Sequence, residues 1–345
     1  MIDRTTSRQN NGPMDLRSKT KHVVDFSPEL YPARVPLHER VAECWGHDGL
    51  GMSYVRQPEV GIERNSLPST LLMVHGNPTW SIHWRSLITE AKSKYQCVAP
   101  DHLGCGYSDN PRRLLTLADH IDNLVALVKR LDLQHITLVA QDWGGAIGLG
   151  AMQRVPERLE RIVLFNTGAF PPPYIPWRIR VCRIPLLGRL AVQGGGLFNR
   201  AALRMTLSRR SRLDPAVAAA YMAPYNSWEN RRAVFGFVKD IPNGPRHPTW
   251  QTLENIERGL PTFADRPALL VWGMRDWCFR PDCLARFEQV WPQAEVHRLA
   301  DVGHWVMEDA PEEAVPLVMQ FLKRTENADG RKLPSASIEG VAQHG

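Results

Sequence analysis

The sequence has little of what marks secreted, disulfide-built or membrane-spanning proteins. No two of its six cysteines form a CxxC pair, which is typical of reduced cytoplasmic thiols rather than of a disulfide framework or a structural metal site. No apolar run approaches the roughly eighteen residues of a membrane-spanning helix. The first nineteen residues also lack the apolar core of a secretory signal. We therefore expect a cytoplasmic protein without a membrane span and without a metal ion or cofactor.

The charge distribution also lacks the pattern of a nucleic-acid-binding protein. The formal net charge is +6 and the pI is near 9.1, but much of the excess is local. It lies in "PWRIRVCRIPLLGRL" (176–190) and "RMTLSRRSRL" (204–213). A local basic patch is more often a solvated surface than a nucleic-acid site. We expect no nucleic-acid partner, and these stretches form either a solvated face, which is the simpler interpretation, or a docking surface for another enzyme.

What the sequence does contain is a regular alternation of strand and helix signals. Residues 1–28 and 325–345 are polar and are expected to be flexible tails. Residues 40–58 alternate around a glycine-containing turn and predict a β-hairpin. The run "STLLMVHG" (69–76) is typical of a strand buried on both faces of a parallel sheet. Alternation from there predicts the α/β class, with a mostly parallel, doubly wound sheet.

An insertion interrupts this alternation. Residues 169–252 contain Pro-rich turns, Arg-rich helical stretches and aromatics, and they separate core segments 29–168 and 253–324. Because insertions after strand ends lie above the site edge of such sheets, we expect a helical lid. Most lid aromatics should form its own core, and some should line an apolar substrate pocket. Phe170, at the lid hinge, and Pro242, after "FVKD", are the candidates.

A carboxylate stands at the sharpest corner of the sequence. In "HITLVAQDWGGAIGLGAM" (135–152) a β-branched run stops at Asp142 and a helix-compatible segment follows at once. Ala140 to Gly144 match the small-x-nucleophile-x-small pattern of a nucleophile elbow, with aspartate at the apex. The absence of an elbow serine speaks against an esterase or a lipase. Asp142 alone is equally well explained as a helix N-cap.

Two later residues favour the elbow. Asp276 ends the predicted strand "ALLVWGMRD", and His304 follows the strand "EVHRLAD", which gives the order nucleophile, acid, histidine. A carboxylate nucleophile attacks carbon to form an ester, against which a histidine base can activate water. The acid fixes the histidine tautomer and stabilises its cation. Each residue alone could be an ordinary loop residue, but the three in this order predict a triad.

The stretch "HGNPTWSIHWR" (75–85) supplies a further candidate. Pro78 favours an extended Asn77 before it, so that an amide N–H of Asn77 can point into the pocket. The indole N–H of Trp143 can point in from the elbow. Two neutral donors beside a carboxylate would cradle a departing anion. The alternative is that Asn77 only makes a turn and Trp143 only packs.

At these residues the sequence resembles the haloalkane dehalogenase family of α/β-hydrolases. The resemblance runs from about residue 25 to residue 323 and rests on "HGNPTWSIHWR", "DHLGCGYSD", "QDWGG" and "DVGHWVMEDAP". It implies the α/β-hydrolase fold, with Asp142 as nucleophile, His304 as base and Asp276 as acid. It also implies that Asn77 and Trp143 stabilise the leaving group. The acid after "VWGMRD" together with the Asn-Trp pair resembles the family's third branch.

A finer likeness points to a reaction without a halogen. "YNSWENRRAVFGFVKDIP" (225–242) and "WGMRDWCF" (272–279) are similar to the β-lactone decarboxylases of long-chain olefin biosynthesis. That resemblance implies conversion of a cis-dialkyl β-lactone to a cis-alkene and carbon dioxide. The implied partners are an apolar small-molecule substrate and other enzymes of that pathway, such as the β-lactone synthetase.

Three other functions remain compatible with the sequence. In a dehalogenase, Asp142 would displace halide and His304 would direct water to the ester. An epoxide hydrolase would need lid tyrosines as proton donors, for which Tyr174, Tyr221 and Tyr225 are available, although that family has an aromatic where Asn77 stands. A non-catalytic receptor on the same scaffold would be expected to lose part of the triad, whose three positions are filled here. Attack at the lactone carbonyl, rather than at the oxygen-bearing carbon, is a variant of the decarboxylase reaction.

Overall fold

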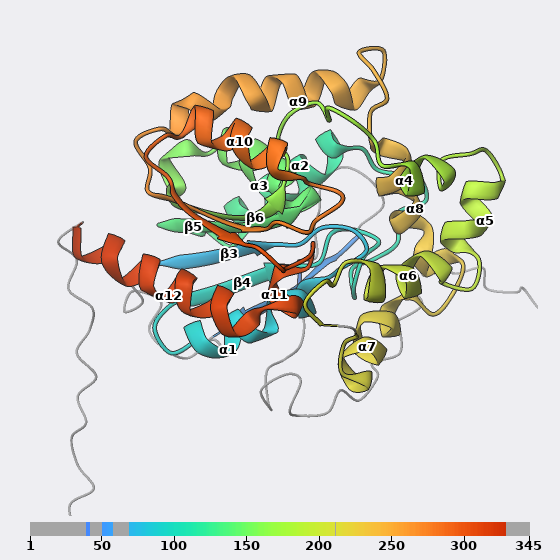
Figure 1. Cartoon of the computed structure of the whole chain (residues 1–345), viewed down its shortest axis with the longest axis horizontal. Helices are drawn as coiled ribbons and strands as arrows, with labels where there is room; N and C mark the ends of the chain where they lie inside the picture. Colours follow the sequence, from blue (N-terminus) through green and yellow to red (C-terminus); the bar gives the residue numbers. More distant parts are fainter. Residues whose placement is uncertain (1–38, 42–49, 58–68, 211, 329–345) are drawn as a thin grey trace, which may run out of the picture.

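An eight-stranded sheet runs through the centre of the computed structural model, which describes residues 39–41, 50–57, 69–210 and 212–328 (Figure 1). The strand order is β1-β2-β4-β3-β5-β6-β7-β8. Strands β3 to β8 are all parallel, and β1 and β2 add an antiparallel edge. The strands are β1 Glu39–Val41, β2 Met52–Gln57, β3 Thr70–Val74, β4 Gln96–Pro100, β5 Ile136–Asp142, β6 Leu159–Thr167, β7 Ala268–Gly273 and β8 Glu295–Leu299. The α/β class with a mostly parallel sheet is confirmed.

Helices cover both faces of this sheet, as a doubly wound fold requires. The side chains of β3 show why: Leu72 and Val74 pack into one hydrophobic cluster, and Leu71 and Met73 pack into the other. Successive strand residues point to opposite faces, so both faces are apolar and both need a cover. One face carries α2 Leu117–Arg130, α3 Trp143–Met152, α9 Pro248–Gly259 and α10 Pro281–Val290; the other carries α1 Arg85–Ala91, α11 Val306–Asp309 and α12 Pro311–Ala328 (Figure 1).

The insertion forms a group of helices beside the sheet, on the right of Figure 1. It follows the carboxyl end of β6 and consists of α4 Trp177–Val181, α5 Leu187–Gln193, α6 Leu197–Met205, α7 Pro215–Met222 and α8 Arg232–Asp240. The expected boundary at residue 252 falls inside α9, which packs against α2 and α3 of the core. The polypeptide therefore returns to the core before residue 252.

The ends of the chain can be compared with the sequence only in part. The expected tail over 1–28 lies outside the described residues, and so does the turn of the predicted hairpin, whose strands β1 and β2 pair antiparallel. At the other end α12 continues to Ala328 instead of stopping at residue 324. Within the described ranges, no helix is both long and apolar enough to cross a membrane.

Candidate active site

Asp142 lies at a strained turn between β5 and α3. Its backbone has φ 54° and ψ −129°, a left-handed φ that non-glycine residues rarely adopt. The turn is tightly packed: a Cβ on Gly76 would lie 2.1 Å from Asp142 Oδ1, and one on Gly144 would lie 2.1 Å from the Val74 carbonyl oxygen. Asp142 occupies the N-cap position of α3, but its side chain makes no capping hydrogen bond, so capping does not explain the carboxylate. The strain instead holds the carboxylate above the sheet, where it lines a cavity.

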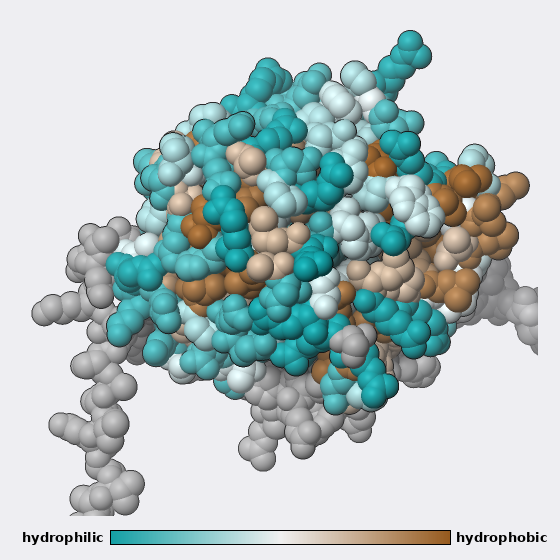
Figure 2. All heavy atoms as spheres, viewed as in Figure 1, coloured by the Kyte–Doolittle hydropathy of each residue, from teal (hydrophilic) through white to brown (hydrophobic). Residues whose placement is uncertain are grey.

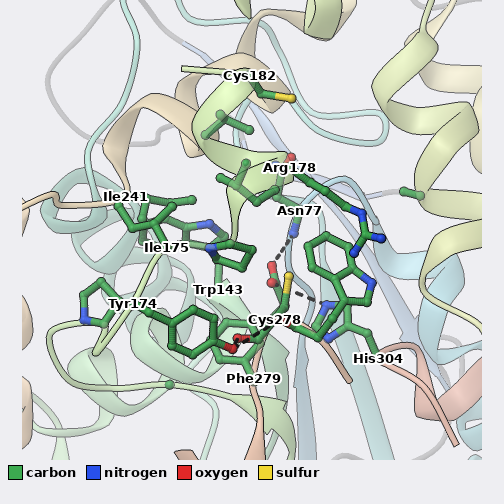
Figure 3. A pocket seen from close by; sticks show the side chains of 18 of the residues that line it. Asn77, Trp143, Tyr174, Ile175, Arg178, Cys182, Ile241, Cys278, Phe279 and His304 are labelled. Atoms are coloured by element: carbon green, nitrogen blue, oxygen red, sulfur yellow. Dashed lines mark hydrogen bonds and ion pairs between the residues drawn. The ribbon is translucent and has the colours of Figure 1, made fainter. Parts of the chain in front are cut away.

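The three residues of the predicted triad lie together, and Figure 3 labels one of them, His304, in the lining of the cavity. His304 Nδ1 is 2.7 Å from Asp276 Oδ2, and His304 Nε2 is 3.5 Å from Asp142 Oδ2. The Cys278 N–H donates to the other Asp276 oxygen at 2.6 Å, and the Asn77 N–H donates to Asp142 Oδ1 at 2.7 Å. Both carboxylates are therefore held by backbone donors, and the imidazole lies between them.

This arrangement sets the charge of the histidine. Burial by itself lowers the pKa of His304, but the carboxylates of Asp276 and Asp142 outweigh burial and raise that pKa to about 10. At neutral pH His304 is a cation between two anions. The same two carboxylates also affect the ionisation of the neighbouring Cys278 thiol. Burial and the two carboxylates raise the pKa of its thiol well above the ordinary value, so this sulfur stays protonated.

A second set of buried polar groups holds the backbone of His304, and the sequence analysis did not predict it. The Gln141 side chain donates to the His304 carbonyl oxygen, and its own oxygen contacts His83 Nε2. His83 Nδ1 is 2.9 Å from the Tyr221 hydroxyl, which is 2.6 Å from Glu308 Oε1. Glu308 in turn pairs with Arg85. The available signal was a polar residue inside the apolar run before the elbow.

The two predicted anion donors both line the cavity beside Asp142, but only one points freely into it. Trp143 has no hydrogen-bond partner for its indole N–H among the residues described. The Asn77 side-chain N–H donates to the Val234 carbonyl of α8 at 3.3 Å, and its side-chain oxygen is buried without a partner. A 3.3 Å bond is at the long end of the normal range. The Asn77 amide thus faces the lid instead of converging fully with Trp143.

The cavity above Asp142 measures about 500 Å³ and is lined mainly by apolar side chains from the lid and the core. Phe170 and Pro242, the two pocket residues expected from the sequence, are both in its lining. The sequence reasoning did not single out several others, including Ile175, Trp177, Ile241 and Phe279. Their places depend on the path of the lid across the core, which no local sequence pattern reveals.

The lid tyrosines do not offer a free proton donor to this cavity. Tyr174 lines it, but its hydroxyl donates to the Cys278 carbonyl oxygen at 2.5 Å. The Tyr225 hydroxyl donates to the Thr79 carbonyl at 2.9 Å, and Tyr221 is part of the buried set behind His304. Epoxide opening needs such a donor, so the geometry gives this activity no support. A cluster of metal-ligating side chains is likewise absent from the described part of the chain.

Comparisons with known proteins agree with this geometry. A family model described as alpha/beta hydrolase fold matches residues 69–311. The chain is 40% identical over 275 residues to a cis-3-alkyl-4-alkyloxetan-2-one decarboxylase of Shewanella oneidensis, covering 78% of this chain and 86% of the relative. It is 39% identical over 289 residues to a protein of the same name from Xanthomonas campestris, with coverages of 80% and 93%.

Dehalogenases are more distant. Haloalkane dehalogenase 2 of Mycobacterium tuberculosis is 28% identical over 302 residues, covering 86% of this chain and 98% of the relative. Among solved structures, the haloalkane dehalogenase DatA from Agrobacterium tumefaciens superposes with a TM-score of 0.73 at 24% identity. That match covers 84% of this chain and 96% of the other, and it shows the shared fold alone.

Proposed function

We propose that this chain, which belongs to the alpha/beta hydrolase fold family, is a β-lactone decarboxylase. Its substrates are cis-3-alkyl-4-alkyloxetan-2-ones, and its products are cis-alkenes and carbon dioxide. The observation that carries the proposal is the 40% and 39% identity to two relatives of that name, against 28% to a dehalogenase. The carboxylate elbow and the apolar cavity supply the chemistry and the binding space for such a substrate.

The reaction can be written with Asp142 as nucleophile. An Asp142 oxygen attacks the ring carbon that carries an alkyl chain and is bound to the ring oxygen. The bond from that carbon to the ring oxygen breaks, and the ring oxygen leaves as part of a carboxylate. Next, the bond between the carboxylate carbon and the neighbouring alkyl-bearing carbon breaks. Its electron pair forms the double bond of the alkene as the bond between the Asp142 oxygen and the other alkyl-bearing carbon breaks. Carbon dioxide leaves and Asp142 is restored without the entry of water. Inversion at the first step and anti departure at the second convert a cis lactone to a cis alkene.

The charge of His304 gives it a role in this sequence of steps. In the resting site the carboxylates of Asp276 and Asp142 raise the pKa of His304 to about 10, so its imidazole carries a proton on Nε2 before the substrate reacts. When the ester forms, Asp142 loses its charge, and Asp276 at 2.7 Å is the carboxylate that holds the proton on His304. The cation and the Asn77 N–H then stabilise Asp142 as it leaves the ester.

The first leaving group of the lactone is a carboxylate, which needs donors of its own. The indole N–H of Trp143 supplies one. The Asn77 side chain supplies a second if its N–H leaves the Val234 carbonyl, 3.3 Å away, and donates to the carboxylate of the ring-opened intermediate. Because Val234 is in α8, this exchange would couple substrate binding to the lid. Halide displacement uses the same donors, and it is the second candidate because the triad would also support alkyl-ester formation from a haloalkane.

A direct comparison of substrates tests the proposal. The purified protein is given a cis-dialkyl oxetan-2-one in one reaction and a bromoalkane in another, and alkene, carbon dioxide and bromide are measured. We expect rapid formation of cis-alkene without solvent oxygen in the product, negligible bromide, and no turnover by Asp142→Ala. Bromide release with an inert lactone would establish the dehalogenase instead. Full activity of Asp142→Ala would exclude the carboxylate nucleophile.

The cellular setting belongs to the same proposal. A dialkyl β-lactone must be made by an enzyme that closes the four-membered ring, so we place this protein after such a step in olefin biosynthesis, in an assembly with the ring-forming enzyme. A cytoplasmic location is supported by free thiols at Cys97, Cys105, Cys182, Cys278 and Cys283.

A further inference from the structure

The lid exposes an unusual amount of apolar surface. Among the described residues, nine large hydrophobic side chains are exposed, and all except Leu114 lie between residues 177 and 205. We call this surface the lid face; its apolar members are Trp177, Val181, Ile184, Leu186, Leu187, Leu190, Leu197 and Met205. Figure 2 shows hydrophobic residues gathered at the right edge of the molecule, where Figure 1 places α5. Exposed apolar patches of this kind mark an interaction site.

Leu186 is the extreme member of the lid face. Its side chain is 82% exposed, and its backbone has a φ of 60°, which is unfavourable for a residue with a Cβ. Glycine or asparagine would suit that backbone better, and a polar side chain would suit that exposure better. Packing within the described chain therefore does not account for a leucine here, whereas insertion into an external apolar phase does.

The charges on the lid face are all of one sign, and among the described residues no carboxylate pairs with them. No Asp or Glu occurs from residue 161 to residue 213. The helices and turns from 177 to 205 carry six arginines, Arg178, Arg180, Arg183, Arg189, Arg200 and Arg204; all are exposed except Arg183, which is partly buried. In the part of the chain that the structure describes, none of the six forms an ion pair with a carboxylate. Elsewhere arginines commonly do, as Arg85, Arg158 and Arg286 show.

The lid face is also the entrance to the cavity. Trp177, Val181, Leu197 and Met205 are exposed on the lid face and at the same time line the cavity above Asp142. A mainly apolar surface, with Arg178 as the charged residue of the lid in its lining, therefore leads from the outside of the lid to the nucleophile. A ligand with two alkyl chains can follow this path without contact with bulk water if the mouth opens into a hydrocarbon phase.

We propose that the lid face docks on an anionic lipid bilayer, with its leucines and Trp177 in the interfacial region and its arginines on the headgroup phosphates. Apolar side chains surrounded by basic ones are the features of proteins that bind in the plane of such membranes. An acidic protein could also meet the arginines, but the position of the cavity mouth favours lipid, because a bilayer dissolves an apolar ligand directly at that mouth. The passage of lactone and alkene through that mouth rests on the proposed function, whereas the docking does not.

Vesicle sedimentation with the full chain tests the docking without any substrate. The probes are large unilamellar vesicles of phosphatidylcholine alone and of an equal mixture with phosphatidylglycerol, each at low and high ionic strength. We expect binding to the mixed vesicles that weakens with salt, and little binding to phosphatidylcholine alone.

Two independent variants assign the binding to the lid face. Arg200→Gln with Arg204→Gln removes two cations whose side chains have no ion-pair or hydrogen-bond partner among the described residues and do not line the cavity. This variant should weaken binding on the order of thirtyfold. Leu186→Asn with Leu190→Asn removes apolar contacts and should weaken binding at least about tenfold. Arg258→Gln with Lys323→Gln removes the same charge from α9 and α12 and should bind as the wild type does. Thermal unfolding shows that each variant is folded.

Three results would overturn the proposal. The first is absence of binding to mixed vesicles at low salt, including the case in which the lid face instead binds the ring-forming enzyme. The second is unchanged binding by both lid variants. The third is a concentration-dependent dimer that the leucine variant abolishes while vesicles bind neither protein, because the occupant would then be a second copy of the chain. A lack of alkene formation in the substrate assay would refute the proposed function and leave this result unaffected.

Discussion

At the scale of single residues, the site depends on groups that act on His304 from two sides. Asp276 contacts its ring at Nδ1, and Gln141 holds its backbone carbonyl. The sequence indicated Asp276, because strand ends can be recognised from local apolar patterns and the order of the triad is fixed. It did not indicate the role of Gln141, whose partners His83 and His304 lie 58 and 163 positions away. Such contacts exist only after the sheet and the loops have assembled.

Substitution of Gln141 should therefore reduce turnover without removing a reacting group. In Gln141→Leu the His304 backbone loses its donor and buried His83 loses a partner, so we expect kcat to fall about tenfold to a hundredfold with KM little changed. Turnover of a short-chain lactone measures this effect. Gln153→Leu is the matched control, since Gln153 donates to the Ile256 carbonyl at 2.7 Å, away from the triad. Equal losses of kcat in the two variants would show that Gln141 has no special role.

At the scale of elements, the strands were easier to predict than the lid. Strands β3 to β7 match apolar runs that are visible in the sequence, because burial on both faces leaves few polar residues in them, whereas the edge strand β8 is largely polar and only partly buried. The short helix α1, after the Asn77 loop, was not predicted. The relation of the lid to the core was also not readable, since α9 begins within the expected insertion but packs on α2 and α3. Those contacts depend on distant segments rather than on periodicity.

One buried carboxylate joins the lid to the core. Asp240, at the end of α8, accepts the Leu117 N–H at the start of α2 at 2.7 Å and the Thr249 hydroxyl of α9 at 2.6 Å. Asp240→Ala leaves both buried donors unsatisfied and should lower the free energy of unfolding by about 2–4 kcal/mol. Urea denaturation measures this loss. Asp122→Ala, which removes an exposed partner of Arg154 from α2, should cost less than about 1 kcal/mol. If Asp240→Ala costs no more than this control, the junction is not holding the lid.

At the scale of the whole molecule, charge is arranged differently on the lid and in the core. Within the described ranges the arginines of the lid face do not pair with carboxylates, whereas the core buries several histidines in the neutral form. The His102 ring contacts those of His75 and His120, and His120 stacks on Phe237, which contacts Trp143. Burial is the main cause that lowers the pKa of each histidine, to about 4 for His102. The stability of the molecule must therefore depend on pH.

The sign of that dependence follows from where the protons bind. An unfolded histidine has a pKa near 6.5, so below that pH His75, His102 and His120 bind protons in the unfolded chain. In the folded protein the same three residues stay neutral, because burial lowers their pKa. Their contribution is fully present above about pH 6.5 and is lost as the pH falls toward the folded values. His304, with its pKa raised to about 10, contributes in the opposite sense, and its share is lost as the pH rises from about 6.5 through 10. Stability should thus be highest near pH 6.5 to 7.

His120→Phe isolates one of these groups. Its Nδ1 is buried without a partner and its ring stacks on Phe237 at 4.4 Å, so phenylalanine preserves the packing and removes the titration. Between pH 7 and pH 5.5 the wild type should lose about 1 kcal/mol more stability than this variant, because one fewer proton is bound by the unfolded variant. Urea titrations at the two pH values measure the difference. If His120→Phe loses as much as the wild type does, protonation of His120 on unfolding is not among the causes of acid sensitivity.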